Sequence, residues 1–204
     1  GEQGLHSTDP RANVASMLKR LFAVFSLFVL AVPSLAAAQG VTSSADPRAT
    51  EAGREILHEG GSAADAAIAM VAVLTLVEPQ SSGIGGGGFM VHHNAKDGSI
   101  STIDGREMAP ASAKPERFLG PDGKARGYMD VIPGGLSVGV PGNVRLMEMA
   151  HNKWGKLEWK ALFQPAIKLA EEGFIVTPAL NNWLVQFEPM WKEFPAPQAI
   201  YYVD

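Results

Sequence analysis

The pattern of apolar and polar residues predicts two consecutive helices in the first half of the chain. Asp46-Pro47 is a typical helix start, because an aspartate can accept hydrogen bonds from free N–H groups and proline suits the first turn. Gly60-Gly61 would end this helix, whose apolar face comprises Ala49, Ala52, Gly53, Ile56 and Leu57. A second helix is predicted from Ser62 to Val77, opened by capping-box spacing. It is apolar on nearly every side but shorter than the about 20 residues of a membrane span, so we expect it to be buried.

A β-hairpin is predicted after this helix. Phe89 to His93 has the composition of a strand, Asn94 to Gly98 has turn chemistry, and Ser99 to Ile103 would return as the partner strand. This places Asp104-Gly105-Arg106-Glu107 at the strand end. His92 and His93 would point to opposite faces, one exposed and one partly buried.

Helices dominate the remaining sequence. Gly- and Pro-rich connections lead to one predicted helix from about Asn143 to Lys153, and a second from about Leu157 to Glu172 ends at Gly173. Thr177-Pro178 begins another. No element is predicted for the tail from Pro195 to Asp204, and no domain boundary is evident after residue 40.

The N-terminal segment has the three parts of a secretory signal. Met17-Leu18-Lys19-Arg20 is basic, residues 21–32 are apolar, and Ala36-Ala37-Ala38 supplies small residues for cleavage. We interpret residues 17–38 as a signal peptide, residues 1–16 as sequence upstream of the natural start, and 39–204 as the mature part. Export to the periplasm or the exterior follows, with no stable membrane span.

Composition excludes several kinds of chemistry. The 204 residues include no cysteine, which excludes disulfides, thiol nucleophiles and thiolate metal sites. No two of the five histidines lie three or four residues apart, so a histidine-built metal site is not expected. A net charge of −4 gives no basic surface for nucleic acid.

The glycine-rich loop Gly83–Gly88 matches G-x-G-x-x-G literally. A dinucleotide site needs this motif after a strand and at the start of a helix, because the helix N-terminus holds the pyrophosphate. Here a helix precedes the loop and a strand follows it. We therefore interpret the loop as a turn with glycines at positive φ or in close backbone contact. A strand immediately before Gly83 would instead favour a dinucleotide-binding oxidoreductase.

Arg106 is the second candidate for a functional residue, after the glycine loop. A guanidinium can clamp a carboxylate in a bidentate manner, which an ammonium cannot. Flanked by Asp104 and Glu107, however, Arg106 could equally form a surface ion pair, and spacing alone favours that interpretation.

Several long motifs resemble the start of the γ-glutamyltransferases (γ-glutamyltranspeptidases, glutathione hydrolases). They occur in the family order and cover roughly residues 41 to 190. The motifs are Asp46–Gly53, Gly60–Ala67, Val77–Phe89, Asp104–Pro110, Val140-Pro141-Gly142 and Pro165–Phe174.

The resemblance implies an α+β fold, the four-layer αββα sandwich of N-terminal-nucleophile hydrolases, with only its N-terminal part present here. Such precursors cut themselves into a large and a small subunit. The new N-terminal threonine attacks the γ-glutamyl carbonyl, with its own amine as base. Glutathione or another γ-glutamyl compound is the implied donor, water or an amino acid the acceptor, and no metal or organic cofactor is needed.

The resemblance also assigns residue roles. Arg106 matches the arginine that holds the α-carboxylate of the γ-glutamyl group, and Glu107 matches an acidic neighbour expected to orient it. The Thr-Thr-His nucleophile motif is absent from these residues, so we expect the catalytic threonine beyond residue 204 and no activity from residues 39–204 alone. The alternatives are a related cephalosporin or glutaryl acylase and a non-catalytic exported remnant.

Overall fold

The computed structural model of the protein describes residues 40–202. The predicted signal peptide, residues 17–38, and the upstream residues 1–16 lie outside this part of the chain. The first two helices occupy the predicted places: α2 spans Pro47–His58 and α3 spans Ala63–Val77. Gly60, with a φ of 91°, turns the chain between them.

The start of α2 is held by an ion pair that includes its capping residue. Asp46 Oδ1 accepts hydrogen bonds from the backbone N–H and the Nε of Arg48, both at 2.8 Å, and Arg48 Nη2 lies 2.6 Å from Asp46 Oδ2. The side-chain hydrogen bond from Arg48 holds the pKa of Asp46 below its usual value. Arg48 Nη1 also donates to Ile175 O, which ties this helix start to the segment after Gly173.

α3 is the central helix, and only Ala63 on it is exposed. It contacts α2, α5 (Asn143–Trp154) and α6 (Gln164–Glu172). Small side chains on α2 and α3 allow these helices to approach closely. Two clusters form the core. One joins α3 to α5 and the hairpin through Ile68, Ile103, Leu146, Met147 and Leu162, and the other joins α2, α3 and α6.

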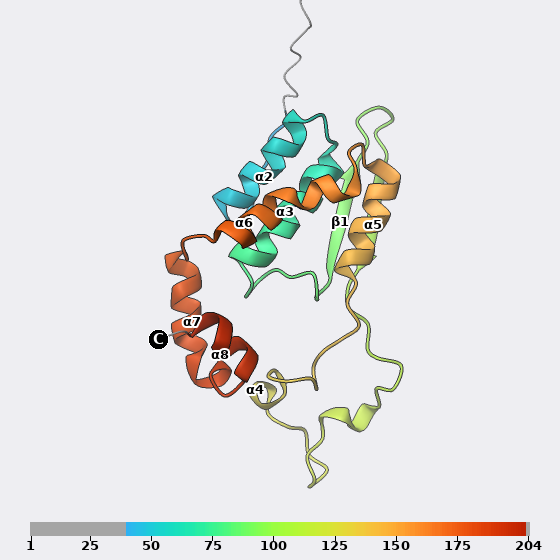
Figure 1. Cartoon of the computed structure of the whole chain (residues 1–204). Coiled ribbons are helices and arrows are strands. Elements are labelled where there is room, and N and C mark those ends of the chain that lie inside the picture. The colour runs from blue at the N-terminus through green and yellow to red at the C-terminus, as the bar shows by residue number, and fades with distance from the viewer. Residues whose placement is uncertain (1–39, 203–204) are drawn as a thin grey trace, which may run out of the picture. The chain divides into compact units, whose positions relative to one another are not determined.

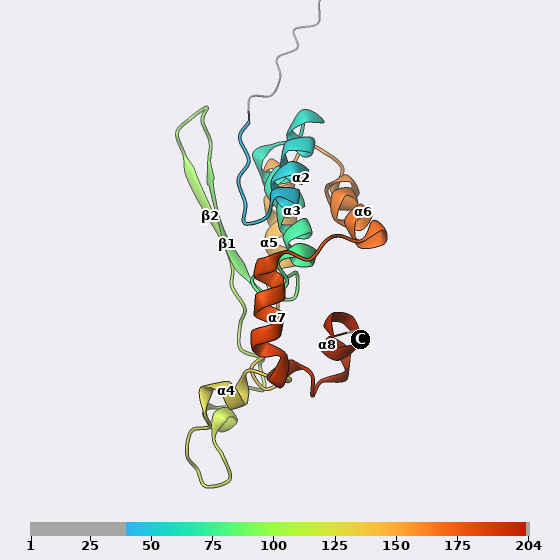
Figure 2. The same cartoon turned by 90° about the vertical axis from the view of Figure 1, so that its left-hand side faces the viewer.

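The predicted hairpin is present as β1 (Gly88–His93) and β2 (Ile100–Gly105), paired antiparallel with Gly88 opposite Gly105. It contacts α5 and lies along one side of the helices (Figure 2). Ile103 points into the core, whereas Phe89 and Val91 are exposed. His92 is partly buried and stacks on Trp154 at 4.0 Å between ring centroids, and His93 is exposed, as predicted.

The second half of the chain differs from the prediction in two places. The single helix expected over 157–172 is a 3₁₀ turn, η2 (Trp159–Phe163), followed by α6. Pro165 explains the change, because it lacks the N–H that a continuous helix requires there. No element was predicted for the tail, but it forms α8 (Pro195–Tyr201). Pro195 occupies the first position of this helix, where proline is favoured. Directly after α8, Tyr202 Oη donates a hydrogen bond to Leu184 O at 2.8 Å.

Between the hairpin and α5, the chain makes a long excursion over residues 106–142 (Figure 1). It contains only a 3₁₀ turn, η1 (Pro115–Phe118), and the single-turn helix α4 (Tyr128–Val131). The excursion returns beside its own start, where Met108 and Val140 form a β-bridge. As predicted, Thr177 caps the next helix, α7 (Pro178–Trp191).

A fully buried carboxylate joins three parts of the core. Asp65 Oδ2 accepts hydrogen bonds from the backbone N–H groups of Ser62, Lys156 and Leu157, at 2.8, 2.8 and 3.3 Å. Its other oxygen faces His151 Nε2 at 3.9 Å, and that nitrogen lies 2.8 Å from Leu157 O. Asp65 thus completes the capping box of α3 and fixes the loop that leaves α5.

We predict that Asp65→Ala lowers the free energy of unfolding by about 3 kcal/mol, because three backbone N–H groups would lose an acceptor that is fully buried. Ser62→Ala is the matched control. It removes only the cap on Asp65 N and should cost about 1 kcal/mol. Urea unfolding monitored by tryptophan fluorescence measures both, and equal losses would contradict the role assigned to Asp65.

The end of β2 and the start of α5 meet backbone to backbone. A Cβ at Gly142 would overlap the carbonyl of Gly105, and a Cβ at Gly105 would lie 2.6 Å from the Cβ of Leu146. Neither glycine has a positive φ. Close approach is therefore the reason for glycine at both positions.

We predict that Gly142→Ala destabilises the protein by about 2–3 kcal/mol, since the added methyl group displaces backbone rather than a flexible side chain. At Gly85, a Cβ would meet nothing within 4 Å, so Gly85→Ala should change stability by less than about 0.5 kcal/mol. Thermal unfolding of the two variants provides the comparison; similar midpoints would refute the steric argument.

Candidate functional site

The candidate site begins where β2 ends. Asp104 Oδ1 accepts a hydrogen bond from the backbone N–H of Arg106 at 2.9 Å, which fixes the backbone just after the strand. The Arg106 side chain is 65% exposed, and its Nη1 lies 3.0 Å from Glu107 Oε2. Glu107 is only 27% exposed. The structure thus brings together the two residues singled out in the sequence and leaves the guanidinium accessible.

Glu107 lies against the glycine-rich loop. A Cβ at Gly87 would be 2.6 Å from Glu107 Oε2 and 2.7 Å from Glu107 N, and a Cβ at Gly86 would be 3.3 Å from Glu107 Oε1. None of the glycines from 83 to 88 has a positive φ. The glycines of this loop are therefore explained by close contact and not by positive φ. The glycines make room for the carboxylate, whose Oε2 is buried with Arg106 as its charged neighbour.

The first turn of α5 holds the same loop. The backbone N–H groups of Gly142 and Asn143 both donate to Gly86 O, at 3.0 and 3.1 Å, and Asn143 Nδ2 donates to Gly83 O at 2.6 Å. Asn143 was not predicted as a site residue, although a polar side chain directly after Pro141-Gly142 is the usual signal of a helix start. These N–H groups are engaged by the protein, and α3 rather than a strand precedes the loop, so the dinucleotide interpretation is wrong.

Arg106 and Glu107 line an open groove with a volume of about 530 Å³. Its walls come from three segments, residues 106–110, 113–118 and 136–139. Arg117 joins two of them: its Nε donates to Leu136 O at 2.6 Å and its Nη2 to Gly135 O at 3.3 Å. The charged lining residues are Arg106, Lys114, Arg117 and Glu107. Three cations and one anion favour a ligand with carboxylate groups.

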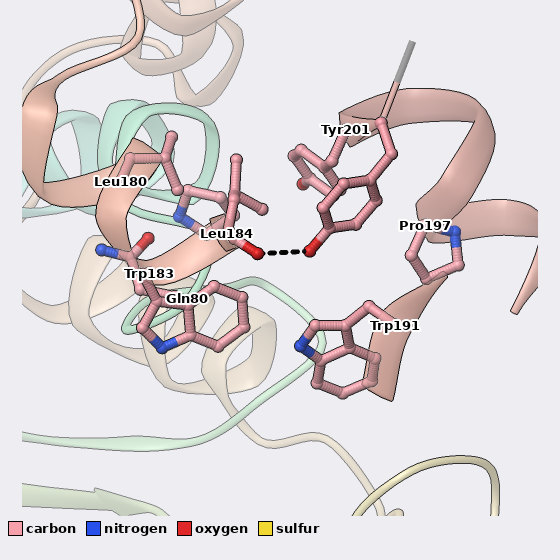
Figure 3. A pocket seen from close by; sticks show the side chains of 9 residues that line it. Gln80, Leu180, Trp183, Leu184, Trp191, Pro197 and Tyr201 are labelled. Carbon is pink, nitrogen blue, oxygen red and sulfur yellow. Dashed lines mark hydrogen bonds between the residues drawn. The ribbon is translucent and has the colours of Figure 1, made fainter. Parts of the chain in front are cut away.

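A second pocket, of about 180 Å³, is lined by Pro79 and Gln80 together with α7 and α8 (Figure 3). Its aromatic lining residues are Trp183, Trp191, Tyr201 and Tyr202, and Tyr202 Oη donates a hydrogen bond to Leu184 O, the carbonyl of another lining residue. No charged side chain lines this pocket. It offers no cationic side chain to a carboxylate, so the groove at Arg106 is the candidate functional site.

Metal binding and membrane crossing are two further properties that bear on the function of residues 40–202. No group of three or more histidine, cysteine, aspartate or glutamate side chains in this part of the chain is arranged to hold a metal ion. None of its helices combines the length and apolar character that a membrane crossing demands.

Comparison with known proteins gives consistent results. Residues 49–203 match the gamma-glutamyltranspeptidase family model. The glutathione hydrolase proenzyme of Bacillus subtilis (strain 168) is 45% identical over 149 residues, and that of Escherichia coli (strain K12) is 42% identical over 146. These alignments cover 73% and 72% of this chain but 25% of each relative. The chain thus spans about a quarter of the length of the curated relatives it matches.

Solved structures show the same likeness. Helicobacter pylori gamma-glutamyltranspeptidase superposes with a TM-score of 0.75 at 36% identity, covering 79% of this chain and 46% of that one. Cephalosporin acylase from Bacillus halodurans gives a TM-score of 0.61, also at 36% identity, covering 73% and 27%. The predicted fold, the N-terminal part of an α+β N-terminal-nucleophile hydrolase, is confirmed. By its sequence and by its structure, the chain belongs to the gamma-glutamyltranspeptidase family.

Proposed function

We propose that this chain is the N-terminal portion of a γ-glutamyltransferase or glutathione hydrolase precursor and that Arg106 binds the α-carboxylate of the γ-glutamyl donor. The observation that carries the proposal is the exposed Arg106 guanidinium at the groove, 3.0 Å from a Glu107 carboxylate set into the glycine loop. Glu107 orients the guanidinium from one side and leaves N–H donors free for a planar carboxylate.

In the proposed reaction, donor binding positions the γ-carbonyl for a threonine that lies outside these residues. The threonine hydroxyl oxygen attacks that carbon, its proton passes to the threonine amine, and the carbon–nitrogen bond of the donor breaks as the leaving amine takes a proton. Water or an amino acid then attacks the γ-glutamyl ester and regenerates the hydroxyl. Arg106 contributes by fixing the far end of the γ-glutamyl group, which places the reacting carbon.

The precursor would self-cleave and pair with a small subunit formed from the same polypeptide. Two of the relatives support this part of the proposal, since they are named glutathione hydrolase proenzymes. Residues 17–38, with the pattern of a signal peptide, support export to the periplasm or the exterior.

A second candidate function is that of a related acylase. This candidate is supported by the cephalosporin acylase structure, which is as similar in sequence to this chain, at 36% identity, as the H. pylori gamma-glutamyltranspeptidase structure is. A glutaryl group is a γ-glutamyl group without its α-amino group, so Arg106 would bind a carboxylate in either case. Rates for matched γ-glutamyl and glutaryl anilides separate the two functions. Preferred turnover of the glutaryl compound would favour the acylase.

We predict that Arg106→Ala, in the protein produced from its complete reading frame, lowers kcat/KM for γ-glutamyl-p-nitroanilide by about 30-fold to several thousand-fold. This range corresponds to the about 2–5 kcal/mol lost when a charged, hydrogen-bonded partner is removed. Arg106→Lys should recover only part of the rate, because an ammonium cannot form the bidentate contact. Intact mass should show the same two self-cleaved fragments in variant and wild type.

Arg54→Ala is the matched control, because Arg54 is also exposed and ion-paired, with Glu51, but lies on α2 away from the groove. Its kcat/KM should be that of the wild type. If Arg106→Ala behaves like Arg54→Ala, Arg106 is only a surface ion-pair residue and the proposed role is wrong.

A further inference from the structure

Lys114 lines the same groove as Arg106. The two residues belong to different lining segments, 113–118 and 106–110. Glu107 is engaged by Arg106, and Arg117 is engaged by the carbonyls of Gly135 and Leu136. Among residues 40–202, by contrast, no carboxylate lies within 4.0 Å of the Lys114 ammonium. Within the described part of the chain, Lys114 is therefore the lining cation that neither a carboxylate nor a hydrogen-bonded carbonyl engages.

The backbone around Lys114 is fixed although its side chain is exposed. Ala113 N donates to Pro110 O at 2.8 Å and Arg117 N donates to Lys114 O at 3.0 Å, so turns hold the chain on both sides. Pro115 follows directly and restricts Lys114 to the extended backbone it adopts, with φ −122° and ψ 156°. The Arg117 side chain then fastens this segment to the third wall of the groove. The Lys114 side chain thus extends from a backbone position that is fixed at the groove.

The ligand chemistry follows from the proposed function, on which this inference rests. A γ-glutamyl peptide carries one carboxylate on its γ-glutamyl group and a second at its C-terminus. Arg106 accounts for the first. A groove with three cations and one anion has a further positive charge to offer at a separate place, and Lys114 supplies it.

We propose that Lys114 is a specificity residue that binds the C-terminal carboxylate of the donor, so that the protein prefers γ-glutamyl peptides over donors with an uncharged leaving group. Because Lys114 is exposed, we expect a preference of about five-fold, as for a solvent-accessible ion pair. Salt should weaken it by screening.

The test uses the protein from its complete reading frame and two donors that differ in one group, glutathione and glutathione C-terminal ethyl ester. The ester masks only the distal carboxylate. We expect the wild type to have a kcat/KM about five-fold higher for glutathione, Lys114→Ala to abolish this ratio, and Lys114→Glu to reverse it. Intact mass should show the same two self-cleaved fragments in both Lys114 variants as in the wild type, which shows that the variants are folded. In 1 M NaCl the wild-type ratio should approach one.

Lys124→Ala is the control. This lysine is 84% exposed, lies 3.8 Å from Asp122 and does not line the groove, so its variant should keep the wild-type ratio. An unchanged ratio in both Lys114 variants would overturn the inference while leaving the proposed function intact. A protein that turns over neither donor would refute the proposed function, and the role of Lys114 with it.

Discussion

The backbone contact between Gly105 and Gly142 is the constraint on which the geometry of the candidate site depends. It allows the first turn of α5 to reach the end of β2, where a side chain on Gly142 would overlap the Gly105 carbonyl. From that position two consecutive N–H groups of α5 bind Gly86 O. The glycine loop is thereby pressed against Glu107. Without the contact between Gly105 and Gly142, the glycine loop, the end of β2 and the start of α5 would not be held together.

A second fixed point lies at the other end of the same helix. Asp65 accepts the N–H groups of Lys156 and Leu157, directly after α5, and lies itself at the buried start of α3. Removing the hydrogen-bonding partner of buried N–H groups is costly, whereas the bonds themselves contribute modestly. α5 is therefore held at both ends, by backbone contact near the groove and by a buried carboxylate away from it. A rigid support of this kind is what a binding residue with a flexible side chain needs.

The sequence predicted the elements whose signals are local. Asp46 and Ser62 act as helix caps as expected, and the turn at Asn94–Gly98 closes the hairpin. Two predictions were wrong, and in both a proline determines where a helix begins. Pro165 lies in the first turn of α6 and interrupts the helix expected over 157–172. Pro195 begins α8 in a tail that has no apolar periodicity.

The groove lay beyond sequence-based prediction for a different reason. Arg106 and Glu107 are neighbours in the chain, so their pairing could be anticipated. The opposite walls come from residues 113–118 and 136–139, which have no periodic pattern, and Arg117 connects them by bonds to backbone carbonyls, which any residue could supply. The same holds for Gly86 and Gly87. The sequence left positive φ and close contact as alternatives for them, and nothing in it indicated that Glu107 is the group they admit.

The proposed binding role accounts for the ion pair between Arg106 and Glu107 better than a contribution to stability does. Exposed pairs contribute between about 0 and 1 kcal/mol, and Arg106 is mostly exposed. Each glycine increases the conformational entropy lost on folding. A glycine-rich loop that leaves space for the Glu107 carboxylate therefore lowers stability, which an ion pair formed only for stability would not justify. A fixed Glu107 carboxylate occupies one side of the Arg106 guanidinium, so a ligand can approach only from the other side. The cost is the partial burial of the Glu107 charge. That cost is reasonable under the proposed function, in which a second carboxylate must be received in a defined orientation.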